Sequence, residues 1–161
     1  MPAISRFGSL FVLPLMLVSL VAAGALVSTP TADAAVRKGK IHRAVSVALH
    51  QIGDPYRYGA AGPNAFDCSG LVYYSYRKAG FRHVPRTSDA QARWGHKVRK
   101  SHLRRGDLMF FHSGGNVYHA AIFLKRNRKG TVVMLDSAKP GTRVHRRHPF
   151  TDQWFGRSLR H

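Results

Sequence analysis

The hydrophobic periodicity of this chain changes once, at Gly106, and that change restricts the folds it can adopt. Before Gly106 the apolar residues recur at the spacing of amphipathic helices, and after it they gather in short runs typical of strands. Three helices are expected. The first covers residues 41–52, and the second begins at Asp67 or Cys68 and ends at Gly80. The third begins at Ser88, which forms a capping-box pattern with Gln91. The expected strands cover residues 107–112, 118–125 and 131–136, with a short one around 143–145. Helices followed by consecutive strands predict an α+β domain with an antiparallel sheet.

The first 34 residues have the pattern of a secretory signal. After Arg6 no charged residue occurs before Asp33, and residues 10–20 are densely apolar. The small-x-small pattern at residues 32–34 predicts cleavage after Ala34, a short basic linker over residues 35–40 and a domain over residues 41–161. The uncharged run is also long enough to span a bilayer, so an uncleaved anchor is the alternative. Either way, we expect an exported protein of the cell envelope.

The charge of the chain is strongly unbalanced. Lys and Arg number 26 against 7 acidic residues, all of them Asp, and the formal net charge is +19. Such a domain is attracted to polyanions, and nucleic acid is the usual partner for this balance. An exported protein meets the anionic polymers of the cell wall first, so we expect those polymers and no specific nucleic acid. The charge alone does not choose between them.

Cys68 is the only cysteine, which excludes an internal disulfide. A single cysteine in an exported protein forms an intermolecular link or is a free thiol. Cys68 stands where a loop is expected to become a helix, and the positive end of a helix stabilises a thiolate nucleophile. The same N–H groups are suited to hold the oxyanion of an acyl-transfer intermediate. An inert buried cysteine is the alternative that periodicity leaves open.

A thiol nucleophile needs a base, and a histidine is the natural candidate. His119 is distinguished from the other nine histidines because it opens an expected strand directly after a Gly-Gly-Asn loop. Its second ring nitrogen needs an acceptor, and Asp136 on the following strand is our first choice. Asp107 is the other contender, although it reads better as the turn that enters a strand.

Several runs of sequence carry a family resemblance. Residues 52–59 read Ile-Gly-Asp-Pro-Tyr-Arg-Tyr-Gly, and residues 66–72 read Phe-Asp-Cys-Ser-Gly-Leu-Val. Shorter runs follow in order, namely Pro85-Arg86-Thr87-Ser88, Arg105-Gly106-Asp107-Leu108 and His119-Ala120-Ala121-Ile122. Over about residues 41–157 the chain closely resembles the NlpC family of cell-wall cysteine peptidases.

The resemblance implies a papain-like core, in which the nucleophile opens a helix packed on an antiparallel sheet. It implies hydrolysis beside a γ-D-glutamyl residue of peptidoglycan stem peptides, at the bond to meso-diaminopimelate or lysine. Cys68 and His119 match the catalytic pair, and Tyr56 matches a tyrosine whose hydroxyl points into the site and is suited to help hold the oxyanion. The positions that match the lining of the substrate groove are Asp67, Ser69, Arg86 and Ser88.

The chain departs from the family pattern at one catalytic position. The third residue is most often His, sometimes Glu, Gln or Asn, and here Asp136 occupies that place. An aspartate still accepts the hydrogen bond and favours the imidazolium, so the triad remains physically sound. His145 and His148 have no acidic or thiol partner at metal-site spacing, and we expect no metal, no cofactor and a monomer. The alternatives are an amidase or acyltransferase on the same fold, or a non-catalytic basic module that binds polyanions.

Overall fold

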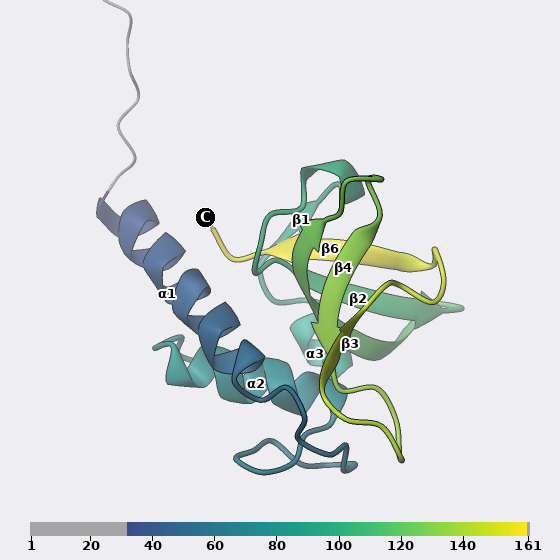
Figure 1. Ribbon diagram of the computed structural model, residues 1–161. Helices are drawn as coiled ribbons and strands as arrows, with labels where there is room; N and C mark the ends of the chain where they lie inside the picture. The colour runs from purple at the N-terminus through teal and green to yellow at the C-terminus, as the bar shows by residue number, and fades with distance from the viewer. Residues whose placement is uncertain (1–31, 161) are drawn as a thin grey trace, which may run out of the picture.

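The computed structural model describes residues 32–160, and the predicted signal up to residue 31 lies outside the described residues. The fold is α+β, as the sequence predicts (Figure 1). The helices are α1 (Ala32–Leu49), α2 (Cys68–Lys78), the short α3 (Ser88–Gln91) and the 3-10 helix η1 (Lys100–His102). The strands are β1 (His96–Val98), β2 (Leu108–Ser113), β3 (Asn116–Arg126), β4 (Val132–Asp136), β5 (His145–Arg147) and β6 (Trp154–Ser158).

Helix α1 begins earlier than its hydrophobic pattern predicts. The apolar period starts at Ile41, but the helix starts at Ala32, so the predicted linker at residues 35–40 is helical. The buried residues of α1 all lie at or after Ile41, because only that half packs on the domain. The first half is rich in Ala, Lys and Arg, which favour helix without any buried face. Within residues 32–160, no helix has the length and apolar character needed to cross a bilayer.

The sheet has six strands in the order β1-β6-β2-β3-β4-β5, and every neighbouring pair is antiparallel. The sequence predicts β2, β3 and β4 to within two residues at each end. The short strand expected at 143–145 is instead β5, His145–Arg147. Two strands were not predicted: β1 has only three residues at an edge, and β6 pairs with β2, which is far from it in the sequence. Their pairing depends on distant segments, which periodicity does not detect.

Both faces of the sheet are covered. Leu108 and Phe110 of β2 point into a core shared with α1 and α2, which lie together on one side of the sheet (Figure 1). The alternate residues Met109 and Phe111 point into a second cluster on the opposite face. Because successive strand residues face opposite sides, β2 must be apolar at consecutive positions to separate two cores.

The expected capping box at Ser88 and Gln91 is wrong. Thr87 caps α3, and its side chain accepts a hydrogen bond from the backbone N–H of Ala90. Gln91 is fully buried, and its Nε2 donates to the carbonyl oxygens of Ser69, at 2.9 Å, and Pro85, at 2.8 Å. The side chain therefore joins α3 to the first turn of α2.

We predict that Gly106→Ala destabilises the protein by about 1–3 kcal/mol in addition to the cost of backbone strain, because the added Cβ overpacks the core. Gly106 has φ +86°, and a Cβ there would lie 2.4 Å from Ile41 Cγ2 and 3.0 Å from Val45 Cγ2. Gly130→Ala is the matched control, since Gly130 has φ +79° and nothing within 4 Å of its Cβ position. The measurement is the urea midpoint of unfolding. Equal midpoints for the two variants would show that α1 does not pack tightly against the turn at Gly106.

Candidate active site

Cys68 is the first residue of α2, so its thiol lies at the positive end of that helix. The thiol is free and half-buried, and it lines a cleft of about 540 Å³. The first turn of α2 lies against the preceding loop, and this approach requires glycine at position 70. A Cβ on Gly70 would lie only 2.0 Å from the carbonyl oxygen of Ala60. The local sequence thus places the candidate nucleophile at a helix start and packs that start against the loop.

The cleft brings together most of the residues that the sequence singles out. Its lining includes Tyr56, Asp67, Cys68, Ser69, Arg86, Ser88 and His119. Ser88 Oγ donates to the carbonyl oxygen of Val117, at 3.3 Å, so α3 is joined to β3 within the cleft. Asp136 does not line the cleft and lies behind His119, where its side chain is fully buried.

Asp67 is the N-cap of α2, and its carboxylate has no free lone pair for a further strong contact. It accepts hydrogen bonds from the backbone N–H groups of Gly70 and Gly59, at 2.6 and 3.0 Å, and from Ser69 Oγ, at 3.2 Å. Arg86 binds both carboxylate oxygens, at 3.0 and 2.7 Å. A carboxylate beside a thiolate disfavours the thiolate by like-charge repulsion. The guanidinium of Arg86 offsets the negative charge of the carboxylate. Arg86 and Asp67 therefore act as a neutral pair next to the nucleophile.

His119 stands on β3 beside an irregularity in the sheet. The register pairs Phe111 with His119 and then His112 with Val117, so Tyr118 is an extra residue on β3. Such a bulge redirects the side chains beside it. Tyr118 is exposed, whereas His119 is buried with 5% of its surface accessible.

The two ring nitrogens of His119 have different partners. Nε2 donates to Oδ2 of Asp136 at 2.7 Å. The Cys68 side chain is the other hydrogen-bond partner, and Nδ1 is the nitrogen left for it. Burial on its own lowers the pKa of His119, but the hydrogen bonds to Asp136 and Cys68 outweigh it and raise this pKa to about 9. Near neutral pH the ring is therefore an imidazolium between a sulfur and a carboxylate.

Asp136 is at the end of β4 and has a second cationic partner. The register that pairs Ile122 with Leu135 brings Asp136 towards His119. Arg147 Nε donates to both carboxylate oxygens, at 3.0 and 2.9 Å, and Arg147 Nη2 donates to Oδ2 at 2.6 Å. Burial raises the pKa of Asp136, but the hydrogen bonds from His119 and Arg147 outweigh it and keep this pKa below its ordinary value. The carboxylate is thus ionised although its side chain is fully buried.

The sequence did not point to Arg147 as part of this site. Asp136 lies opposite His145 in the ladder, so Arg147 is a diagonal neighbour of Asp136 on the same face of the sheet. The expected strand ended at residue 145, two residues too early to expose this relation. Phe150 covers the pair, with the Arg147 guanidinium 4.8 Å from its ring centre, and stacks on Phe111 at 4.6 Å. In the sequence, the only indication of this contact is that Arg147 is a long cationic side chain two residues after His145, the residue opposite Asp136.

Tyr56 lines the cleft near Cys68 and is half-buried. Its backbone N–H donates to the carbonyl oxygen of Thr142, at 2.9 Å, which joins its loop to the segment before β5. Burial, the Cys68 thiolate and the Asp67 carboxylate all raise the pKa of the Tyr56 phenol. The hydroxyl therefore keeps its proton and remains a hydrogen-bond donor beside the sulfur.

Residues 53–161 match the model of the NlpC/P60 family. The chain belongs to this family. It is 42% identical over 117 residues to a probable endopeptidase of Corynebacterium glutamicum, an alignment that covers 72% of this chain and 53% of the relative. It is 32% identical over 126 residues to the murein DD-endopeptidase MepH of Escherichia coli, covering 73% of this chain and 45% of MepH. The chain thus spans about half the length of these relatives.

A solved structure extends the likeness to the fold of this NlpC/P60 domain. The NlpC/P60 domain of the peptidoglycan hydrolase SagA superimposes with a TM-score of 0.65 at 30% identity, covering 74% of this chain and 98% of the SagA domain. The α+β core expected from the sequence resemblance is therefore confirmed. The whole-protein activities of the relatives are properties of those proteins.

Asp107, the rival candidate for the third catalytic residue, is not part of the cleft. Its Oδ1 accepts a hydrogen bond from Ser158 Oγ at 2.8 Å, and Arg160 Nε lies 3.4 Å from the same oxygen. Asp107 thus stabilises the end of β6, away from His119.

The pair His145 and His148 does not converge on a common point. Their Nδ1 atoms are hydrogen-bonded to the backbone carbonyls of Arg143, at 2.7 Å, and of Val132, at 2.6 Å. Among residues 32–160 no three His, Cys, Asp or Glu side chains gather in a metal-binding arrangement.

We predict that Asp136→Asn and Arg147→Gln shift the alkaline limb of the activity profile in opposite directions. The imidazolium form of His119 persists up to its pKa of about 9 and is then lost as pH rises. Asp136→Asn removes the negative acceptor and should move the limb down by roughly one pH unit. Arg147→Gln leaves the carboxylate to His119 alone and should move the limb up. The measurement is kcat/KM against pH on a soluble stem-peptide fragment.

Arg93→Gln is the matched control for Arg147→Gln, because Arg93 pairs with Asp89 at 2.6 Å on the exposed surface of the protein. This change should leave the alkaline limb in place. Movement of the limb in the same direction for both Asp136 and Arg147 variants would contradict the charge balance described for the site.

Proposed function

We propose that this chain is an exported cysteine endopeptidase that hydrolyses the peptide part of peptidoglycan. One observation carries the proposal: the connected series from Cys68 through His119 to Asp136 at the wall of an open cleft. Membership of a family whose relatives are named endopeptidases supports the same substrate class. The scissile bond that we propose joins a γ-D-glutamyl residue to meso-diaminopimelate or lysine.

The proposed mechanism is acyl transfer through a thioester. His119 acts as the base of the pair and holds the proton from the Cys68 thiol as an imidazolium. The thiolate attacks the γ-glutamyl carbonyl carbon to form a C–S bond. The resulting oxyanion is held by the backbone N–H of Cys68 and by the Tyr56 hydroxyl, which remains protonated because its pKa is raised. The imidazolium of His119 then protonates the leaving amine as the C–N bond breaks. Water, deprotonated by His119, hydrolyses the thioester and restores the thiol.

The charges around the cleft support this assignment. The Asp136–Arg147 pair holds the imidazole in one orientation, and the Asp67–Arg86 pair forms the floor beside the thiol. Ser69 and Ser88 also line the cleft, so we assign Asp67, Ser69, Arg86 and Ser88 to the substrate groove. Since both carboxylate oxygens of Asp67 are engaged, the role of Asp67 in the groove is to hold Arg86 and the start of α2. We infer that direct polar contact with substrate falls to Arg86 and the two serines.

Export and wall association form the second part of the proposal. The charge pattern of residues 1–34 and the cleavage pattern before Ala35 support a secretory signal. The formal net charge of +19 supports attraction to anionic wall polymers. A non-catalytic binding module would share this charge but would not need the Cys68–His119–Asp136 series. An amidase or acyltransferase would share that series and differ only in the bond or in the final acceptor.

We predict that Cys68→Ala lowers the release of peptide fragments from purified peptidoglycan by at least about 10³-fold and leaves sedimentation with the wall unchanged. His119→Gln should have a comparable effect on release, because both residues act on the same step. His50→Gln is the control, since His50 is an exposed histidine at the end of α1 outside the cleft. Continued fragment release by Cys68→Ala would refute the peptidase mechanism and leave the binding module.

Defined muropeptides test the proposed bond. We predict that mass spectrometry of digests detects L-alanyl-γ-D-glutamate and a product that begins with the diamino acid. A cross-linked dimer serves as the competing substrate, because the relative MepH is named a DD-endopeptidase. Cleavage of the dimer cross-link with an intact γ-D-glutamyl bond would contradict our assignment of the bond and retain the cysteine mechanism.

A further inference from the structure

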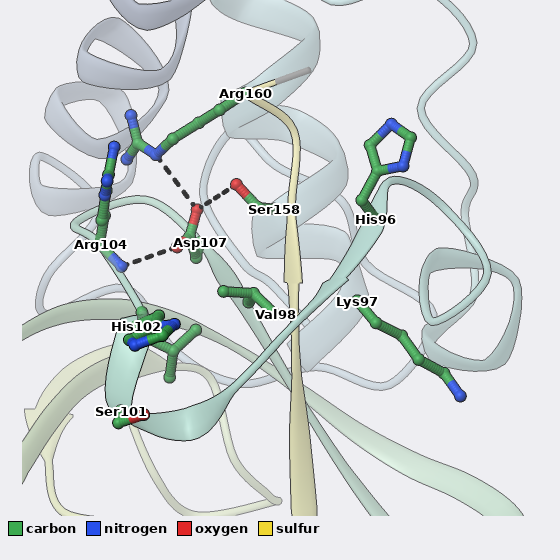
Figure 2. Close-up of a pocket in the computed structure, with 10 residues that line it drawn as sticks. His96, Lys97, Val98, Ser101, His102, Arg104, Asp107, Ser158 and Arg160 are labelled. Carbon is green, nitrogen blue, oxygen red and sulfur yellow. Dashed lines mark hydrogen bonds and ion pairs between the residues drawn. The ribbon is translucent and has the colours of Figure 1, made fainter.

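A second pocket, of about 580 Å³, lies away from the catalytic cleft and shares no lining residue with it. It is formed by β1, by η1 and the residues that follow it, and by the end of β6, as Figure 2 shows. In the sheet order, β1 and β6 lie on one side of β2, whereas the strands of His119 and Asp136 lie on the other. A ligand held in this pocket therefore leaves the cleft open.

The segment that forms much of this pocket is the most basic part of the domain. Seven of the ten residues from 96 to 105 are Lys, Arg or His, and none is acidic. The single acid of the pocket, Asp107, is buried, and both its oxygens are engaged. Oδ2 accepts from the backbone N–H of Arg104 at 2.7 Å, and Oδ1 accepts from Ser158 Oγ at 2.8 Å. The pocket thus presents cationic groups without a free carboxylate.

Two arginine side chains line this pocket. Figure 2 shows the Arg104 and Arg160 side chains rising from opposite sides of Asp107, with their ends turned to the same region. The Arg104 guanidinium has no hydrogen bond or ion pair within the described part of the chain, and its side chain is exposed. Arg160 Nη2 donates to the carbonyl oxygen of Arg105 at 2.5 Å. Its Nε is buried and lacks a hydrogen bond, although it is an ion-pair partner of Asp107 at 3.4 Å.

An arginine with unused donors, in a concave site that a second arginine also lines, suits a phosphate group. Arginine presents its N–H groups in a planar fork that matches phosphate oxygens in pairs, and it is less strongly hydrated than lysine. Arg104 supplies the available donors, because its guanidinium is exposed and has no partner in the described part of the chain. The volume also lies in the range of sites that enclose small ligands, so it accommodates a phosphodiester with its neighbouring sugar or polyol.

We propose that this pocket binds the phosphodiester groups of an anionic wall polymer and holds the enzyme on the wall while the cleft works. The location on the wall rests on the proposed function, whereas recognition of phosphate does not. The proposal assigns to one site the attraction that the net charge would otherwise spread over the whole surface. It therefore predicts that charge changes at this pocket have a larger effect than equal changes elsewhere.

The test compares Arg104→Glu with Arg128→Glu, in protein that also carries Cys68→Ala so that the wall stays intact. Arg128 is an exposed residue of the turn between β3 and β4, so both variants change the net charge equally. Binding is measured by sedimentation with purified walls, before and after hydrofluoric acid removes their phosphodiester polymers. We expect Arg104→Glu to weaken binding to untreated walls by about tenfold, and Arg128→Glu by about twofold or less. Unchanged unfolding midpoints establish that both variants are folded.

Three outcomes would overturn the proposal. Equal weakening by both variants would show that only overall charge matters. Equal loss with Arg104→Glu on treated and untreated walls would show that the ligand is not a phosphodiester. Two further measurements use the phosphodiester polymer released from the walls in soluble form and millimolar inorganic phosphate as a competitor. Competition by phosphate without any binding of the released polymer would assign the pocket to free phosphate. Failure of Cys68-dependent hydrolysis, measured separately with Cys68 present, would refute the proposed function and leave the phosphate site standing.

Discussion

The hydrogen bond between His119 Nε2 and Asp136 Oδ2, at 2.7 Å, joins the two halves of the candidate site. It links β3 to the end of β4, and it turns the other ring nitrogen to the sulfur at the start of α2. The next residue on β4 strengthens the same junction, since Ser137 Oγ donates to the carbonyl oxygen of Phe66 at 2.7 Å. The sheet therefore holds both His119 and the loop that leads into Cys68.

Aspartates are scarce in this chain, and the three that are buried each have an arginine partner. Asp67 pairs with Arg86, Asp136 with Arg147 and Asp107 with Arg160. Burial of an unpaired carboxylate costs several kcal/mol, so a very basic sequence supplies a partner at each of these positions. The first pair lines the cleft, the second lies behind His119, and the third lies at the second pocket. The excess of positive charge thus serves the interior as well as the surface.

The local patterns predicted much of the site because each of its parts is local. A helix start at Cys68 follows from a loop with turn-forming residues and an apolar helical period, and a strand at His119 follows from an apolar run after a flexible loop. Strand β6 and the contact of Arg147 with Asp136 were missed, because pairing between distant segments leaves no periodic mark in either one. The start of α1 was missed for another reason, since its first half buries nothing.

The sequence by itself determined the α+β class and the position of the single cysteine at a helix start, and it predicted the candidate base and acceptor, because those depend on short-range periodicity and residue chemistry. Tertiary structure alone decided which carboxylate meets the imidazole: Asp136 lies behind His119, whereas Asp107 belongs to a different pocket. It also decided that Arg147 shares the Asp136 carboxylate, that Asp67 is fully engaged, and that two arginines line a pocket beside β1 at one edge of the sheet. These features depend on strand register and on the direction of each side chain, which are set only when distant segments pack together.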